Sequence, residues 1–144
     1  MNKKFWRCFI CNDIHWGVRP PEVCPTCQAR SAYVETTSRE ARTVLGHPLA
    51  DGPDFSPEEF RRAIESFAGD NAFRVNPDPA RVESLLDGLF ENERNHGLKY
   101  CPCRLRTKEF EEDVKIICPC NFPSHDTYKG VDRGECWCGL FIKR

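Results

Sequence analysis

The chain has 144 residues, of which 40% are hydrophobic and 30% charged, and its formal net charge is −1. This balance indicates one or two small globular domains. The near-zero charge argues against the strong basic field with which proteins bind nucleic acid or anionic membranes. The sequence holds no apolar run near the roughly 18 residues that predict a membrane span, so we expect neither a nucleic-acid nor a membrane partner.

The chain contains ten cysteines, and its first residues lack the apolar stretch of a secretory signal. Disulfide scaffolds belong to secreted proteins, whereas intracellular cysteine-rich chains more often bind metals or carry out redox chemistry. The sequence therefore predicts a cytoplasmic protein whose cysteines serve metal and redox functions.

Residues 1–35 hold two Cys-x-x-Cys pairs, formed by Cys8, Cys11, Cys24 and Cys27. This spacing is typical of a tetrahedral site with four thiolate ligands for one metal, and it does not choose between zinc and iron. Fewer than 40 residues cannot bury an adequate core, so the metal must supply much of the stability of this segment. The aromatic residues expected around the site are Phe5, Trp6, Trp16 and Tyr33.

Residues 36–100 contain no cysteine and predict helices. Thr37 or Ser38 can cap a short helix that ends at Gly46, and a loop is expected from His47 to Phe55. A capping box with proline at the first helical position then starts a second helix at Ser56. The apolar residues on the inner face of this helix are Phe60, Ile64 and Phe67.

A third helix is expected to start at Asp78-Pro79 and to end near Gly97. Its predicted inward residues are Val82, Leu85, Leu86, Leu89 and Phe90. A short helix is expected between Arg106 and Val114.

The last third of the chain holds three cysteine pairs with a one-residue gap: Cys101, Cys103, Cys118, Cys120, Cys136 and Cys138. Pro102 and Pro119 stiffen the first two pairs and favour an extended backbone there. One sulfur of such a pair can bind a cluster while the other faces outward. Six sulfurs exceed by two the four that an iron–sulfur cluster usually takes, and two thiols beside a cluster can form a disulfide. The alternative is that all six bind metal, in a larger cluster or a thiolate-rich zinc site.

The N-terminal segment resembles the short rubredoxin domain of rubrerythrins over about 30 residues. The match runs through Trp6-x-Cys8-x-x-Cys11, Ile14-His15-x-Gly17, Pro20-Pro21-Glu22 and Cys24-Pro25-x-Cys27. The resemblance implies one iron held by four thiolates that passes one electron, with zinc as the alternative. Asn12 and Gln28 stand where such domains usually have glycine in a positive-φ conformation, which asparagine tolerates better than glutamine.

The C-terminal pairs resemble the catalytic subunit of ferredoxin:thioredoxin reductase, over roughly residues 80–144. The match includes Cys101-Pro-Cys103-Arg104, Cys118-Pro-Cys120 and Cys136-x-Cys138-x-Leu140-Phe141. The resemblance implies that Cys101, Cys118, Cys120 and Cys136 bind a [4Fe-4S] cluster and that Cys103 and Cys138 form the redox-active disulfide. Together with the first module it points to the rubredoxin-bearing ferredoxin:disulfide reductases of anaerobic prokaryotes.

The helix signals and the two resemblances together predict a rubredoxin-like β module over residues 1–35 and a mainly α, cluster-binding catalytic domain over residues 36–144. The implied function is reduction of a thioredoxin- or glutaredoxin-like disulfide with electrons from a ferredoxin or a similar one-electron donor. Cys103 would attack the target, and Cys138, held by the cluster meanwhile, would resolve the mixed disulfide. The rubredoxin-like metal would be an entry point, an alternative path or a store for electrons.

Two other classes of function remain as alternatives. One is an iron–sulfur electron-transfer protein without disulfide reductase activity, and the other is a non-catalytic zinc module. Plant-type members of the reductase family have histidine where this chain has Trp137. His125 is then the candidate for acid–base work, and an exposed loop histidine without a role is the alternative reading.

Overall fold

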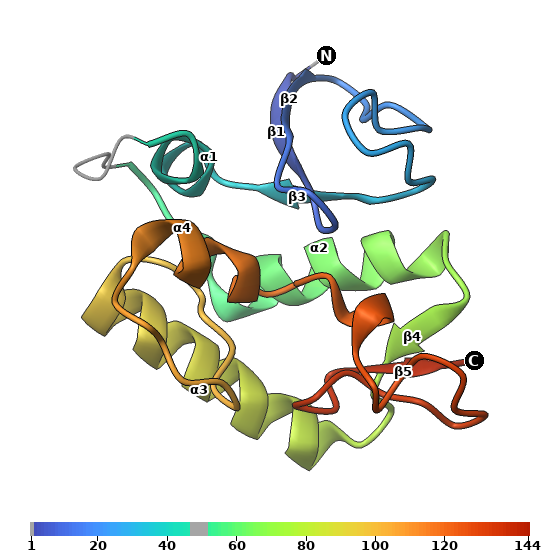
Figure 1. Ribbon diagram of the computed structural model, residues 1–144. Helices are drawn as coiled ribbons and strands as arrows, with labels where there is room; N and C mark the ends of the chain where they lie inside the picture. The colour runs from blue at the N-terminus through green and yellow to red at the C-terminus, as the bar shows by residue number, and fades with distance from the viewer. Residues whose placement is uncertain (1, 47–51) are drawn as a thin grey trace. The chain divides into compact units, whose positions relative to one another are not determined.

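The computed structural model describes residues 2–46 and 52–144. The chain divides into two compact units, Met1–Asp70 and Asn71–Arg144 (Figure 1). Of the predicted loop from His47 to Phe55, residues 47–51 lie outside the described residues. None of the helices in the described part combines the length and the apolar composition needed to cross a bilayer.

A three-stranded antiparallel sheet forms the first part of the N-terminal unit. Its strands are β1 (Lys4–Cys8), β2 (Ile14–Gly17) and β3 (Tyr33–Thr36), in the order β2-β1-β3. The first Cys-x-x-Cys pair lies at the turn from β1 to β2, and the second lies in the long connection from β2 to β3. The register pairs Cys8 with Tyr33, so that the tyrosine lies directly across the sheet from a cysteine of the first pair.

Two helices complete the N-terminal unit at the places that the capping signals predict. Helix α1 (Ser38–Val44) begins after Thr37, whose side chain accepts a hydrogen bond from the backbone N–H of Glu40. Helix α2 (Pro57–Gly69) begins with a complete capping box between Ser56 and Glu59 and buries the predicted apolar face. It packs on β3.

The C-terminal unit is built on helix α3 (Pro79–His96) and a two-stranded antiparallel sheet, β4 (Phe73–Val75) with β5 (Phe141–Lys143). Asp78 caps the start of α3, and Gly97 ends it with a left-handed φ of 94°. The predicted inner face is buried except for Phe90, which is half-buried. The remaining short elements are α4 (Phe110–Asp113), η1 (Val114–Ile116) and η2 (Phe122–Ser124).

An aromatic cluster brings the ends of the C-terminal unit together. The rings of Phe122 and Phe141 stack at 5.0 Å, and Phe73 meets both of them edge-on. All three side chains are at most 4% exposed. Since Phe73 precedes α3 and Phe141 follows the last cysteine pair, this cluster fixes the last pair against the start of the unit.

The prediction of a mainly α domain is wrong. Helices hold 35% of the described residues, and 17% are extended. The long amphipathic helices form as expected, but the cysteine pairs lie in turns and in short extended segments. An isolated bridge between Tyr100 and Ile117 joins the segments around the first two pairs with a one-residue gap. Proline after the first cysteine of both pairs disfavours helix, and pairing across the chain supplies the backbone partners instead.

Candidate metal and redox centres

The four N-terminal cysteines form two knuckles of the same local design. The backbone N–H of Asn12 donates to the carbonyl of Cys8, and that of Gln28 donates to the carbonyl of Cys24, both at 2.9 Å. Asn12 and Gln28 have φ angles of 65° and 69°. Both non-glycine residues therefore adopt the left-handed conformation that such a knuckle requires, and the departure from glycine leaves the turn intact.

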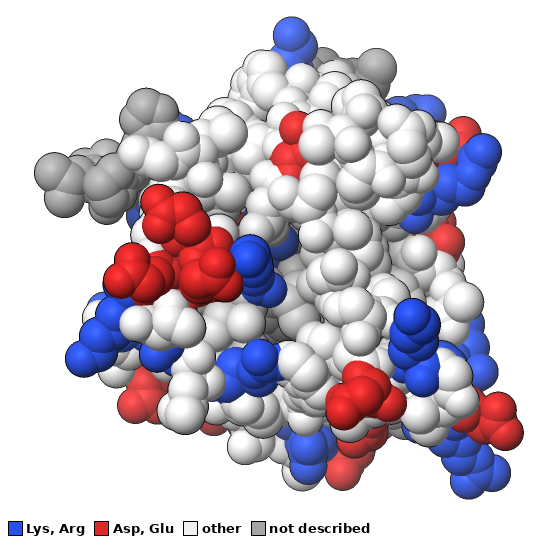
Figure 2. Space-filling view, in the orientation of Figure 1, with Lys and Arg blue, Asp and Glu red and all other residues white. Residues whose placement is uncertain are grey.

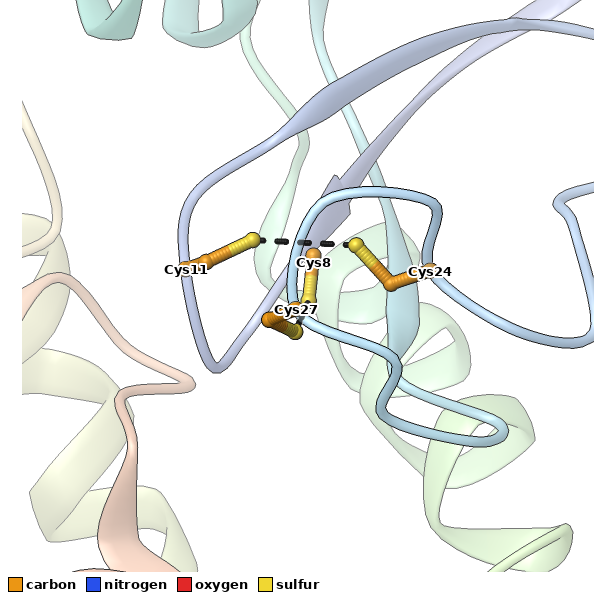
Figure 3. A group of neighbouring side chains, drawn as sticks. All are labelled: Cys8, Cys11, Cys24 and Cys27. Atoms are coloured by element: carbon orange, nitrogen blue, oxygen red, sulfur yellow. Dashed lines mark hydrogen bonds between the residues drawn. The ribbon is translucent and has the colours of Figure 1, made fainter.

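The four sulfurs fit a single tetrahedral metal ion. Their Sγ atoms all lie within 4.8 Å of one another (Figure 3). The Cys8–Cys27 and Cys11–Cys24 separations are both 3.7 Å. A tetrahedron with metal–sulfur bonds of about 2.3 Å has sulfur–sulfur edges of about 3.8 Å. The site therefore has the size that one zinc or iron ion needs.

The pKa values of these thiols show that burial opposes the ionised form, which a bound cation would stabilise. Burial raises the pKa of Cys8 to about 11, and burial likewise raises the pKa of Cys11. Burial opposes ionisation of Cys24 too, but a hydrogen bond from the Tyr33 hydroxyl, for which Asp13 competes, and hydrogen bonds from backbone N–H groups lower its pKa. Four thiolates this close repel one another, and a bound metal ion compensates the repulsion.

Two residues that sequence reasoning missed hold the first knuckle. Arg7 is 1% exposed, and its Nη1 donates to Asn12 Oδ1 at 2.8 Å. Its Nε lies 3.6 Å from a carboxylate oxygen of Glu40, and this carboxylate also accepts a hydrogen bond from Thr36. The buried guanidinium thus links the knuckle to α1. A charged residue directly before a metal-binding cysteine gives no sequence signal for such burial.

The aromatic shell around the site differs in part from the prediction. Tyr33 is 5% exposed and contacts Cys24. Trp6 donates from Nε1 to the carbonyl of Gly17 at 3.0 Å. Trp16, in contrast, is 53% exposed and lies against Phe5, with ring centroids 4.5 Å apart. Tyr33 is therefore in direct contact with a ligand sulfur.

In the C-terminal unit, backbone pairing brings the first two narrow pairs side by side. The N–H of Cys118 donates to the carbonyl of Lys99, and that of Cys101 donates to the carbonyl of Ile116, both at 2.9 Å. In the last pair, the N–H of Cys136 donates to the carbonyl of Phe141 at 2.9 Å. Backbone hydrogen bonds of the kind found between strands therefore hold each of these segments.

The six sulfurs of this unit differ in exposure. Four of the cysteines are buried, Cys120 is half-buried and Cys103 is exposed. Cys138 Sγ lies 3.6 Å from Cys136 Sγ, and Cys138 also contacts Cys101. None of the ten cysteines, all of which lie in the described part of the chain, forms a disulfide, so the predicted Cys103–Cys138 disulfide remains a prediction. The hydrogen bond with Cys101 is the largest factor that raises the pKa of Cys138, to about 12.

The turn that carries Cys138 is held by two residues that sequence reasoning missed. Arg81, on α3, donates from Nη2 and Nε to the carbonyl of Cys138, at 2.8 and 3.3 Å. Asn76 donates from Nδ2 to the carbonyl of Gly139 at 2.8 Å. Arg81 and Asn76 each lie more than 50 positions before the carbonyl that they bind, so no local sequence pattern indicates these contacts.

A stack of three side chains lies between the first and last narrow pairs. The guanidinium of Arg104 lies 3.4 Å from a ring centroid of Trp137, and the His125 ring stacks on Trp137 at 3.6 Å. Two groups this close to one indole must occupy its opposite faces. Asp126 accepts a hydrogen bond from Trp137 Nε1 at 3.1 Å. Arg104 follows Cys103, and Trp137 precedes Cys138, so the stack joins the two segments that carry these cysteines.

His125 is 7% exposed, which excludes the alternative of an exposed loop histidine. Its Nε2 lies 3.8 Å from Cys120 Sγ, and its Nδ1 accepts a hydrogen bond from the backbone N–H of Trp137 at 3.3 Å. Burial, followed by the charge of Arg104, lowers its pKa to about 4.

The surroundings of the narrow pairs suit an iron–sulfur cluster. The backbone N–H of Phe141 donates to Cys136 Sγ at 3.3 Å, as is common for cluster ligands. Within the described residues, Arg104 Nη1 is buried without an acceptor. Sulfur atoms of a bound cluster or of its ligands would supply one. The compact grouping that suits a single ion is found, in the described part of the chain, only for the four N-terminal cysteines.

Comparison with protein families gives two matches. A family model described as the ferredoxin thioredoxin reductase catalytic beta chain matches residues 55–144, and one described as the rubrerythrin, rubredoxin-like domain matches residues 6–35. Comparison with curated proteins returned no match. The chain therefore belongs to the ferredoxin thioredoxin reductase catalytic beta chain family, whose members are oxidoreductases acting on disulfides, and it carries a rubredoxin-like domain in its N-terminal part.

Proposed function

We propose that this protein is a ferredoxin-dependent disulfide reductase that uses a [4Fe-4S] cluster and a neighbouring dithiol to reduce a thioredoxin-like protein. The proposed cluster ligands are Cys101, Cys118, Cys120 and Cys136. The observation that carries the proposal is the contrast between the two remaining thiols. Cys103 is exposed, whereas Cys138 is 5% exposed beside Cys101 and Cys136.

The exposed thiol suits attack on a protein substrate. Cys103 lies in a surface loop with Leu105, which is 94% exposed. Cys103 attacks one sulfur of the target disulfide, which forms a mixed disulfide and releases the other target sulfur as a thiolate. A target that docks on this loop meets the thiol directly.

The buried thiol suits resolution. Cys138 attacks the Cys103 sulfur of the mixed disulfide, which releases the fully reduced target and leaves a Cys103–Cys138 disulfide. The stack between Arg104 and Trp137 supports this pairing because it joins the two segments. Two electrons and two protons then regenerate the dithiol. The cluster, when bound, would supply the electrons one at a time from a low-potential donor.

The driving force is adequate for this direction. A ferredoxin at about −400 mV and a thioredoxin at about −270 mV differ by about 6 kcal/mol for two electrons.

The charges near the proposed docking loop are of both signs. Acidic side chains gather over α4, the helix that follows the loop, and Glu111 and Glu112 there are exposed (Figure 2). Arg106, within the loop, lies 3.7 Å from Asp113. Such a surface favours a specific protein partner over a uniformly charged polymer.

The test is thiol formation in thioredoxin by the full chain reconstituted with iron and sulfide, with reduced ferredoxin as donor. We expect Cys103→Ser to keep its iron and sulfide and to lose thioredoxin reduction. Cys138→Ser, the matched variant, should instead accumulate the mixed disulfide with thioredoxin. Activity that survives in Cys103→Ser would refute the assigned roles. A preparation that contains zinc and no sulfide would refute the proposed iron–sulfur cluster. A redox-active cluster without thioredoxin reduction would favour the alternative of an electron-transfer protein.

A further inference from the structure

We propose that Tyr33 and Asp13 together set the reduction potential of a metal ion in the four-cysteine site, because the carboxylate and a ligand sulfur compete for one hydroxyl proton. The Tyr33 hydroxyl lies 2.7 Å from Asp13 Oδ2 and 3.4 Å from Cys24 Sγ. A phenol has a single proton and can donate it to only one of these acceptors at a time.

The fold fixes this three-residue arrangement. Tyr33 is paired with Cys8 across the sheet and is 5% exposed, while Cys24 is fully buried. The His15 ring meets the Tyr33 ring edge-on, with centroids 6.2 Å apart. The backbone carbonyl of Asp13 accepts a hydrogen bond from the N–H of Cys8 at 2.9 Å. Ring and carboxylate are thus both anchored to the first knuckle.

The two distances indicate whether Asp13 or Cys24 accepts the hydrogen bond from the Tyr33 hydroxyl. A hydrogen bond to a carboxylate oxygen is charge-assisted and short, whereas a thiolate sulfur that shares its charge with a metal ion is the weaker acceptor and forms longer bonds. With Asp13 as carboxylate, the proton therefore lies mainly toward Asp13. Cys24 Sγ then faces the oxygen lone pairs of Tyr33, with the negative charge of Asp13 beyond them.

The direction of this proton has an electrostatic consequence for the metal. A hydrogen bond onto a ligand sulfur withdraws electron density and stabilises the reduced metal, which raises the potential. While the hydroxyl proton points to Asp13, Cys24 lacks that hydrogen bond, so the reduced metal is not stabilised by it. The nearby Asp13 carboxylate also adds negative charge. Asp13 therefore keeps the potential of this site low through Tyr33. Tyr33 and Asp13 act through Cys24 and are positioning residues.

The test is the midpoint potential of the N-terminal centre in the full chain loaded with iron, followed by its visible absorption. Asp13→Asn should raise the potential, because the amide can donate to the Tyr33 oxygen and so release the hydroxyl proton toward Cys24. The same substitution in a Tyr33→Phe background should give at most half of that shift. Glu35→Gln is the matched control: it removes one negative charge from the same sheet, on a residue paired with Lys4, and should leave the potential unchanged.

Equal shifts in the two backgrounds would overturn the proposal, since the charge of Asp13 would then act without the hydroxyl. The absence of any shift in Asp13→Asn would overturn it as well. If Tyr33→Phe does not hold iron, the chain loaded with a spin-active cadmium isotope gives a second measurement. Scalar coupling between cadmium and the Tyr33 hydroxyl proton should be larger in Asp13→Asn than in the unmodified protein, and equal couplings would refute the competition.

This inference does not depend on the proposed disulfide reductase activity, because it concerns only the four-cysteine site. Loss of thioredoxin reduction in the cysteine variants and loss of the potential shift in Asp13→Asn are separate results.

Discussion

Replacing Asn12 and Gln28 separately by glycine should change the stability of the metal site in opposite directions. Both residues have a left-handed φ, of 65° and 69°, at equivalent positions of the two knuckles. For a residue other than glycine, this conformation costs about 1–2 kcal/mol. Glycine removes that cost but raises the entropy of the unfolded chain by an equivalent of about 0.5–1 kcal/mol.

For Gln28→Gly, the backbone strain that is relieved should exceed the cost of the added entropy in the unfolded chain. Besides the strain, the change removes a side-chain hydrogen bond to the carbonyl of Pro25, which is exposed and 3.3 Å long. Such a bond contributes little in water. We expect Gln28→Gly to stabilise the module by about 0.5–1 kcal/mol.

For Asn12→Gly, the losses should exceed the backbone strain that is relieved. Asparagine tolerates the conformation better, so less strain is relieved. The change also removes the acceptor of the 2.8 Å hydrogen bond from the buried Arg7 guanidinium. Hydrogen bonds to charged groups contribute about 1.5–3 kcal/mol, so we expect a net destabilisation of about 1–2 kcal/mol.

The assay is competition for zinc between the full chain and a chromophoric chelator, because metal affinity in such a module includes its folding free energy. The expected changes are an affinity about 2–5-fold higher for Gln28→Gly and about 5–30-fold lower for Asn12→Gly. Effects of the same sign in both variants would refute the role assigned to Arg7. Tighter binding in both variants would show that backbone strain alone governs the two knuckles.

Three further predictions concern the C-terminal unit. Gly88→Ala should lower the iron and sulfide content, because a Cβ there would lie 2.9 Å from Pro102 and displace the first narrow pair; unchanged content in metal analysis would contradict this. Arg104→Ala should slow thioredoxin reduction several-fold while cluster content stays constant, since it removes the stack on Trp137, which contributes about 0.5–2 kcal/mol. Arg104→Lys should retain part of the rate, and equal rates in all three proteins would exclude the positioning role. Burial opposes the ionisation of Asp113, but hydrogen bonds from the preceding loop lower its pKa overall; its contribution to stability is therefore present above the unfolded pKa and lost as the pH falls through the folded one. Denaturation as a function of pH should show Asp113→Asn to be less stable than the unmodified protein at neutral pH, with a difference that shrinks below about pH 4.

The local signals predicted much of the helical structure. The capping box at Ser56 and the Asp78-Pro79 start both mark helices that form where expected, and Gly97 ends α3. These signals work because a cap satisfies backbone groups within three or four residues of itself. The same signals led to the wrong prediction of a mainly α domain. They say nothing about the turn and bridge segments that carry the narrow cysteine pairs.

The sequence by itself determined the content of the two cysteine groups: four cysteines at knuckle spacing, and six cysteines in three narrow pairs. Residue types and short spacings follow directly from the sequence because they require only neighbouring residues. Only the tertiary structure decided that Cys103 is exposed while Cys138 is buried, and that Arg81 and the Arg104–Trp137 stack hold their segments. It also decided that Asp13 and Cys24 share the Tyr33 hydroxyl. Burial and hydrogen bonding between residues far apart in the chain depend on how the elements pack, and no local pattern encodes them.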